Sequence, residues 1–242
     1  MYLENLVFDA VDPARLGRFW EEAVGGERLT DQPGVFETRL AVEGGPVFDL
    51  CFQQVPEPPS EAQRLHLDLR GGVRQAEVVE RLRGLGAEHV DIGQGDVPWV
   101  VLGDVEGNPF CVMEERSAYD GSGPIAALPL DSADPERDAG FWGWLTGWTR
   151  VEGIGLVSLR HPSLKGPLLE LCPELGPKGS FEEAKNRLHL DLRLETGDDP
   201  DAVAAGIAER GGRELHPDWG DLPWRLYADP SGNELCVLPA RD

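Results

Sequence analysis

The sequence has little positive charge. Its 242 residues include 22 Lys and Arg against 44 Asp and Glu, which gives a formal net charge of −22. Such an acidic surface repels nucleic-acid phosphates and anionic lipids, so we expect neither a nucleic-acid partner nor a membrane partner. The charge does not argue against a small-molecule site, because a local pocket need not share the sign of the whole protein.

Long apolar runs are also missing. No stretch reaches the length of about 18 apolar residues that a membrane helix needs, and the N-terminus lacks the basic-then-apolar plan of a signal peptide. We therefore expect a cytoplasmic protein. A hydrophobic fraction of 40% is nevertheless sufficient for a packed core.

Motifs of several enzyme classes are absent. The sequence has no nucleophile elbow, phosphate loop or dinucleotide fingerprint, and Gly71-Gly72 lacks the third glycine of such a loop. Its four cysteines form no CxxC pair and lie in apolar runs that are typical of strands. We expect them to be buried and reduced, because free cysteine packs as a small apolar residue.

An internal repeat organises the chain. The heptapeptide at 64–70 recurs unchanged at 187–193 and reads RLHLDLR in both places. Each copy also carries Asp-Pro followed by Phe-Trp, and later a turn that contains Gly-Asn. We interpret this as a tandem duplication with a first domain at 1–117, a Gly- and Ser-containing linker at 118–124 and a second domain at 125–242.

Each copy is predicted to consist of two similar halves. The order strand, helix, strand, strand occurs in the first half and then roughly recurs in the second. Asp12-Pro13 and Asp134-Pro135 are helix starts, because Asp is a good N-cap and Pro is tolerated at the first helical position. The repeated heptapeptide alternates Leu with polar residues, which predicts a strand with its leucines in the core. The pattern favours an α+β fold with mostly antiparallel sheet.

With these ordered motifs, the chain resembles the vicinal-oxygen-chelate superfamily, and within it the glyoxalase-like and bleomycin-resistance-like domains. The resemblance covers nearly the whole chain, with one domain per copy. It implies two tandem glyoxalase-like domains, each built of paired βαβββ modules whose sheets form a cup around a ligand site. Such scaffolds include lyases, dioxygenases, epimerases and drug-binding proteins without chemistry, so the fold does not determine the function.

The resemblance also implies four places for metal ligands, usually His or Gln, Glu, His and Glu. Only the His of this set is present in both copies. In the second copy the first place holds alanine, which cannot ligate a metal, and in both copies Cys replaces the last Glu. We therefore assign no metal and no cofactor. The alternative is a divalent metal held by His, carboxylate and thiolate, which zinc accepts. In sequence order the four places hold Asn5, Asp49, His66 and Cys111 in the first copy, and Ala127, Glu170, His189 and Cys236 in the second.

Strand alternation indicates which side chains line each cup. Asp49 and Cys51 share one face of their strand, and we expect them to converge with the polar face of the heptapeptide in the same copy. Two tryptophans that follow prolines in the two copies could add an aromatic wall. No residue is assigned a catalytic role. The candidate pocket residues are Asp49, Cys51, His66, Asp68, Trp99, Cys111, Glu170, Cys172, His189, Asp191, Trp224 and Cys236.

Structural roles compete with these assignments. The two histidines could instead hydrogen-bond the Asp two residues later or a neighbouring strand and stabilise the sheet. Asp68 could form an ion pair with Arg64 or Arg70, and the tryptophans could simply fill the core.

We expect a protein that binds a small organic ligand in one or both cups without the usual metal centre of the family. A cationic ligand would suit the acidic chain. The alternative is a metal-dependent lyase or isomerase of the glyoxalase type, or a dioxygenase, that uses His66 or His189 with Asp49 or Glu170. A third reading is a structural or regulatory duplication whose cups are filled by side chains. We expect a monomer, because the two domains on one chain can pack as an intramolecular pseudo-dimer.

Overall fold

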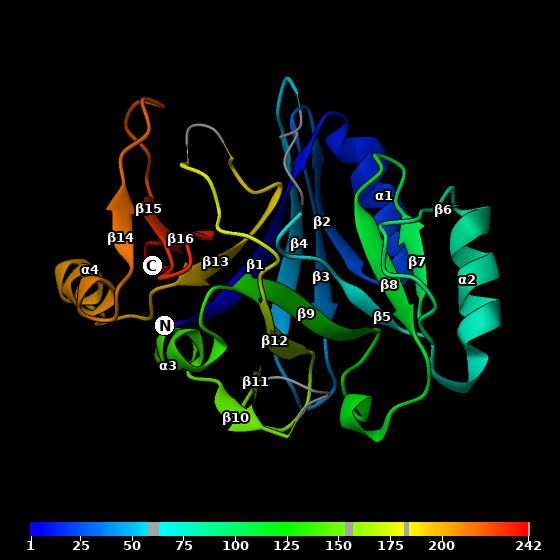
Figure 1. The fold of residues 1–242 in the computed structure, drawn as a ribbon. Coiled ribbons are helices and arrows are strands. Elements are labelled where there is room, and N and C mark those ends of the chain that lie inside the picture. Colours follow the sequence, from blue (N-terminus) through cyan, green and yellow to red (C-terminus); the bar gives the residue numbers. More distant parts are fainter. Residues whose placement is uncertain (58–62, 153–156, 182–183, 242) are drawn as a thin grey trace.

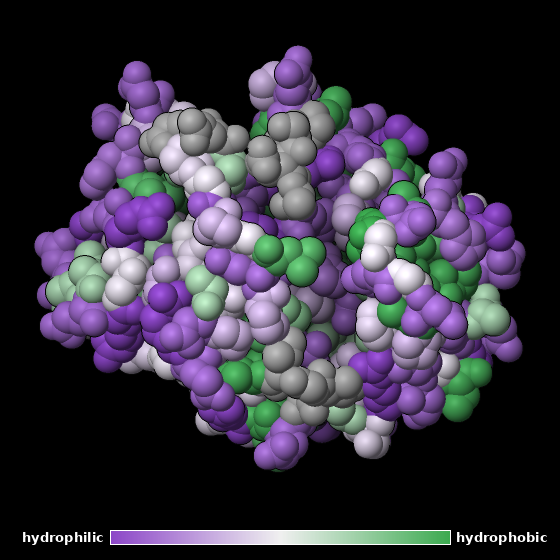
Figure 2. Space-filling model, in the orientation of Figure 1, coloured by the Kyte–Doolittle hydropathy of each residue, from purple (hydrophilic) through white to green (hydrophobic). Residues whose placement is uncertain are grey.

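In the computed structural model of the protein, two mixed sheets form the frame of the molecule (Figure 1). The structure describes residues 1–57, 63–152, 157–181 and 184–241. Hydrophilic residues dominate the face seen in Figure 2, as the net charge requires. Within the described ranges, no helix is long and apolar enough to cross a membrane.

The two sheets each contain strands from both copies of the repeat. The first sheet has, in spatial order, β14 (Arg213–Leu215), β15 (Arg225–Ala228), β16 (Glu234–Leu238), β13 (Leu188–Arg193), β1 (Tyr2–Ala10), β4 (Val47–Gln54), β3 (Val35–Ala41) and β2 (Glu27–Gln32). The second sheet has β10 (Thr149–Val151), β11 (Val157–Arg160), β12 (Leu168–Pro173), β9 (Ile125–Ser132), β5 (Asp68–Arg70), β8 (Pro109–Met113), β7 (Val100–Gly103) and β6 (Glu88–His89).

An exchange of halves follows from this strand order. The first sheet joins the first half of copy one to the second half of copy two, through antiparallel pairing of β1 with β13. The second sheet joins the remaining halves through antiparallel pairing of β9 with β5. Each half contributes one parallel pair, such as β1 with β4, and its other pairs are antiparallel. The predicted α+β fold of paired βαβββ modules is confirmed, whereas the domain boundaries at 118–124 stay a prediction from the repeat.

In the described part of the chain, four α-helices cover the sheets: α1 (Pro13–Val24), α2 (Gln75–Gly84), α3 (Pro135–Thr146) and α4 (Pro200–Glu209). The Asp-Pro starts are confirmed, since the carboxylates of Asp12 and Asp134 accept hydrogen bonds from backbone N–H groups in the first turns of α1 and α3. Both helices end at a glycine with φ near +70°, a conformation that glycine adopts without strain.

The core runs through both copies. All leucines of the repeated heptapeptide are buried, as predicted. Trp20 and Trp142 are also buried, and their indole N–H groups donate to Asp104 (2.9 Å) and Asp229 (3.1 Å). Trp20 lies on α1 and Asp104 in the turn between β7 and β8, so this bond links the two halves of one copy across the sheets. The halves of a copy therefore meet through helix packing, while the sheets continue between copies.

The heptapeptide does not form a full strand in the first copy. Residues 188–193 are all strand, but in the first copy the strand is limited to Asp68–Arg70, preceded by a single bridge between Leu65 and Leu130. The backbone N–H of His66 donates to the carbonyl of Pro129 (3.2 Å), but proline has no N–H to return the bond. In the first sheet the residue opposite His189 is Val7, which unlike proline has a backbone N–H group.

Candidate functional site

A cluster of three donor groups lies on the first sheet. His189 and Asp191 share one face of β13, and Cys236 lies opposite Asp191 on β16. The distance from His189 Nε2 to Asp191 Oδ1 is 3.3 Å, and that from the same nitrogen to Cys236 Sγ is 3.7 Å. The three donor atoms all lie within 4.8 Å of one another. We call these residues the His189 cluster.

The second sheet repeats this arrangement with His66, Asp68 and Cys111, which we call the His66 cluster. Asp68 lies opposite Cys111 on the neighbouring parallel strand β8, and its Oδ1 is 3.4 Å from His66 Nε2. The three donor atoms again lie within 4.8 Å of one another. The structure thus brings together six of the predicted site residues as two equivalent groups.

Burial and neighbouring charge determine how these groups hold protons. Burial, and then the nearby Asp191, raise the pKa of Cys236 well above that of a free thiol. Burial followed by Asp68 raises the pKa of Cys111 in the same way. Burial opposes the charged form of His66, but the hydrogen bond and charge of Asp68 more than offset it and leave the pKa of His66 raised. Without a bound cation, both thiols are therefore neutral at physiological pH.

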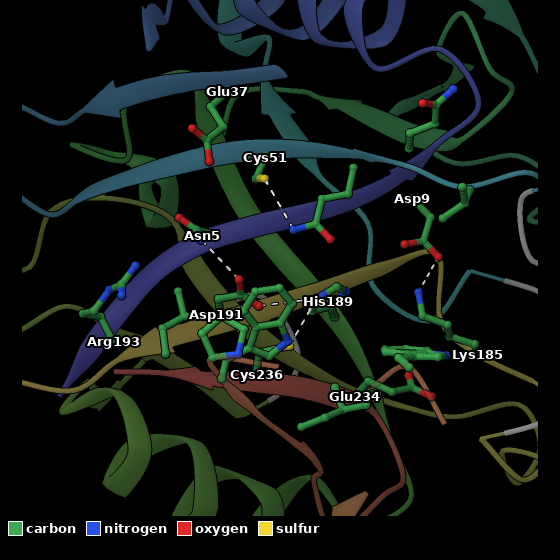
Figure 3. A pocket seen from close by; sticks show the side chains of 18 of the residues that line it. Asn5, Asp9, Glu37, Cys51, Lys185, His189, Asp191, Arg193, Glu234 and Cys236 are labelled. Atoms are coloured by element: carbon green, nitrogen blue, oxygen red, sulfur yellow. Dashed lines mark hydrogen bonds and ion pairs between the residues drawn. The ribbon is translucent and has the colours of Figure 1, made fainter. Parts of the chain in front are cut away.

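A cavity of about 880 Å³ opens beside the His189 cluster (Figure 3). Its lining combines carboxylates with the apolar side chains of tryptophan, proline and leucine. Figure 3 shows Glu37 and Cys51 on strands of the first copy and the His189 cluster on strands of the second. The lining includes Asn5, Asp9, Glu37, Cys51, Glu57, Lys185, His189, Asp191, Arg193, Trp219, Pro223, Trp224, Leu226, Glu234 and Cys236.

A second cavity of about 470 Å³ lies beside the His66 cluster and is lined by His66 and Cys111. Its charged lining also includes Arg64, Lys178 and Asp131. Neither cavity is filled by side chains, so the structure does not support the reading of a purely structural duplication.

The predicted convergence within one copy is wrong. Cys51 lines the first cavity with the His189 cluster, and not with the His66 cluster, because β4 and β13 belong to the same sheet. Asp49 lies on that sheet too, but its carboxylate accepts two hydrogen bonds from Arg39, at 2.8 and 2.9 Å, and does not line the cavity. Alternation along β4 correctly predicted that Asp49 shares a face with Cys51. The sequence alone does not show which strands lie beside β4.

Glu170 and Cys172 lie on β12 of the second sheet, with the His66 cluster. Glu170 is buried and is the second cause, after burial itself, of the rise in the pKa of Cys172 to about 12. All four cysteines are unpaired, and all but the half-buried Cys172 are buried, as predicted.

Of the remaining predicted residues, one lines the first cavity and the other is partly buried outside both cavities. Trp224 lines the first cavity. Trp99 lines neither; its indole donates to Gln94 (2.7 Å) and its ring contacts the guanidinium of Arg116.

The predicted ion pair of Asp68 with an arginine of its own heptapeptide is also wrong. Arg64 pairs with Glu174 (2.7 Å) and Arg70 with Asp120 (2.9 Å), which are carboxylates outside the repeat. These partners leave Asp68 facing His66.

Several lining residues were not predicted. Asp9, Glu37, Lys185 and Trp219 lie in segments far apart in sequence, and no motif joins them. Asp9 and Asn5 do share a face of β1 by alternation, a signal that becomes useful once β1 is known to lie beside β13.

The four-ligand metal centre of the resembled family does not fit either sheet. In the first sheet the four places hold Asn5, Asp49, His189 and Cys236, and Asp49 is already engaged by Arg39. In the second sheet the first place holds Ala127, which has no donor atom. We therefore derive no step through that centre.

Comparison with known proteins agrees with this architecture. A family model described as glyoxalase-like domain matches residues 5–113 and again 127–238. Glyoxalase I from Zea mays superposes with a TM-score of 0.64 at 17% identity, covering 98% of this chain and 92% of that chain. A putative dioxygenase from Bacillus subtilis gives 0.59 at 15% identity, covering 100% and 86%. A search of curated proteins found no match. At these identities the solved structures show a shared fold.

Proposed function

The chain belongs to the glyoxalase-like domain family of the vicinal-oxygen-chelate superfamily, and on that premise we propose that its larger cavity binds a small organic cation. This binding would not use the four-ligand metal centre usual in the family. The observation that carries the proposal is the excess of carboxylates in a cavity of about 880 Å³. That volume is within the range of about 300–1,000 Å³ found for small-molecule sites.

The charge of the cavity favours a cation. Five carboxylates line it, against one lysine and one arginine. Both basic side chains are already paired, Lys185 with Asp9 and Arg193 with Glu4. Among the described residues, neither Glu37 nor Asp191 has a lysine or arginine partner; Glu37 accepts a hydrogen bond from Thr30 (2.8 Å). A cationic ligand would supply the missing positive charge in a partly desolvated site.

The apolar residues of the lining favour a ligand with a flat apolar body. Trp219, Trp224 and Leu226 line the cavity, and the ring of Phe181 packs against Trp219 at 5.6 Å between centroids. Aromatic faces attract cations and stack with other rings. The carboxylates and the aromatic residues of the lining together therefore suit an aromatic ammonium or amidinium compound.

Calorimetric titration with benzyltrimethylammonium and with benzenesulfonate tests the proposal. We expect the cation to bind at one site per chain and the anion not to bind. Glu37→Gln should weaken cation binding about tenfold, the equivalent of about 1.4 kcal/mol, while the matched change Glu80→Gln at an exposed ion pair should have no effect. Equal binding of both compounds, or an unchanged affinity in Glu37→Gln, would contradict the proposal.

The alternative is a metal-dependent lyase or isomerase of the glyoxalase type, or a dioxygenase. The His189 cluster supports this alternative, because imidazole, carboxylate and thiolate are all metal ligands. Turnover of a glutathione hemithioacetal with added divalent metal, lost in His189→Ala, would support it over simple binding. No turnover with any divalent metal would exclude the glyoxalase form of this alternative.

A further inference from the structure

We propose that the chain has a second site for an organic cation, beside the smaller cavity, and that the side chain of Arg116 occupies this site. Arg116 follows β8 in the segment that joins the two copies. The site is separate from the larger cavity of the proposed function, and its ligand class is an alkylguanidinium or a small alkylammonium ion. Arg116 takes the place of such a ligand and closes the site to cations from solution.

The guanidinium of Arg116 lies over two aromatic rings. Its Cζ is 5.6 Å from the ring centroid of Trp99 and 5.9 Å from that of Tyr119. A cation within about 6 Å of a ring centroid is attracted to the ring face, and proteins that recognise quaternary ammonium groups use several such rings around one cation. The contacts that hold Arg116 therefore also suit an external cation of similar size.

Negative charge surrounds the two rings. Nε of Arg116 donates to Oε1 of Glu114. Burial, followed by the charges of Glu170 and Asp68, raises the pKa of Tyr119. Oε2 of Glu114 and the hydroxyl of Tyr119 are both buried and have no hydrogen-bond partner among the described residues. Because buried polar groups without partners are unfavourable, a bound cation with several N–H donors can stabilise this arrangement.

The aromatic pair adjoins the smaller cavity. Tyr119 and Cys111 belong to one packed cluster on the second sheet, and Trp99 packs against it. Cys111 also lines the smaller cavity, as does Gln94, which accepts the indole N–H of Trp99. The side chain of Arg116 is 18% exposed, so solvent reaches it. A cation from solution therefore has a path to the position that the guanidinium holds.

The first sheet has the same tryptophan without an arginine over it. Trp224 is the repeat equivalent of Trp99 and lines the larger cavity of about 880 Å³, whereas Trp99 does not line the smaller cavity of about 470 Å³. The repeat equivalent of Arg116 is Arg241, which pairs instead with Glu4 at 2.8 Å. The tryptophan is thus open to a ligand in the first sheet and covered by the chain's own cation in the second.

Calorimetric titration with ethylguanidinium tests the proposal. We expect Arg116→Ala to bind one more ethylguanidinium per chain than the wild-type protein binds. Arg210→Ala is the matched control, because Arg210 also lies over a tryptophan ring, 4.1 Å from the centroid of Trp144, but neither residue lines either cavity. The control should keep the wild-type stoichiometry. Trp99→Leu, added to Arg116→Ala, should weaken the additional site about tenfold.

Three results would overturn the proposal. They are an equal stoichiometry in Arg116→Ala and the wild-type protein, an additional site in Arg210→Ala, and an additional site whose affinity Trp99→Leu leaves unchanged. Arg116→Ser provides the same test if the alanine variant fails to fold.

The same titrations separate this proposal from that of the larger cavity. A wild-type protein that binds no cation, with one bound in Arg116→Ala, would contradict the proposed function and support the second site. One cation bound in both proteins, with its affinity lowered in Glu37→Gln, would support the proposed function and overturn the second site.

Discussion

Replacing Leu190 by alanine tests whether the two copies of the repeat unfold as one unit. Leu190 is 1% exposed; it lies opposite Leu6 on β1 and beside Leu235 on β16, at the junction where the first sheet passes from one copy to the other. Truncating a leucine at such a site leaves a cavity and costs about 2–5 kcal/mol. For a chain of this length, each kcal/mol lowers Tm by about 2–4 °C, so we expect a decrease of about 4–20 °C.

The shape of the calorimetric transition decides between two architectures. Because the sheets and the core continue between copies, Leu190→Ala and its repeat equivalent Leu67→Ala should both shift a single transition of the whole chain. Val73→Ala, at a side chain that is 87% exposed, is the control and should change stability by less than about 0.5 kcal/mol. Two separate transitions, with only one of them shifted by each leucine variant, would refute the shared core.

Further predictions concern pH and association. Burial raises the pKa of Asp229 to about 6 from its ordinary 3.8. As the pH falls, the folded protein therefore binds a proton at Asp229 at a higher pH than the unfolded chain does. This contribution to stability is present at low pH and is lost as pH rises through about 6. In the wild-type protein the free energy of unfolding should therefore gain up to about 3 kcal/mol from Asp229 between about pH 7 and pH 4. Denaturation at the two pH values should show that Asp229→Asn abolishes this gain. Light scattering should show a monomer, since each sheet already contains both copies, and an obligate dimer at low concentration would contradict this.

Much of the fold could be predicted from local signals. Asp-Pro at two helix starts and leucine at alternate positions of 64–70 each depend on neighbours within a few residues. Those predictions are confirmed by the caps of α1 and α3 and by the buried leucines. The reduced state of the cysteines followed in the same way from their apolar surroundings.

The exchange of halves could not be predicted, because the repeat makes the choice ambiguous. The strand partner of β1 could be 64–70 or 187–193, and these heptapeptides are identical, so alternation and propensity favour neither. The same ambiguity misplaced Cys51 with Cys111 when it lies on the sheet of Cys236. Local sequence predicted which face each candidate occupies, but the partner across the cavity depends on tertiary pairing.

The central claim is that the larger cavity, built from both copies, binds an organic cation through its carboxylates and its aromatic residues. A crystal structure of the protein with benzyltrimethylammonium tests it most directly. We predict one bound cation with its ring against Trp224 from the second copy and its ammonium group beside Glu37 or Asp191. A cavity that stays without the cation at saturating concentration, or a cation bound away from these side chains, would contradict the claim.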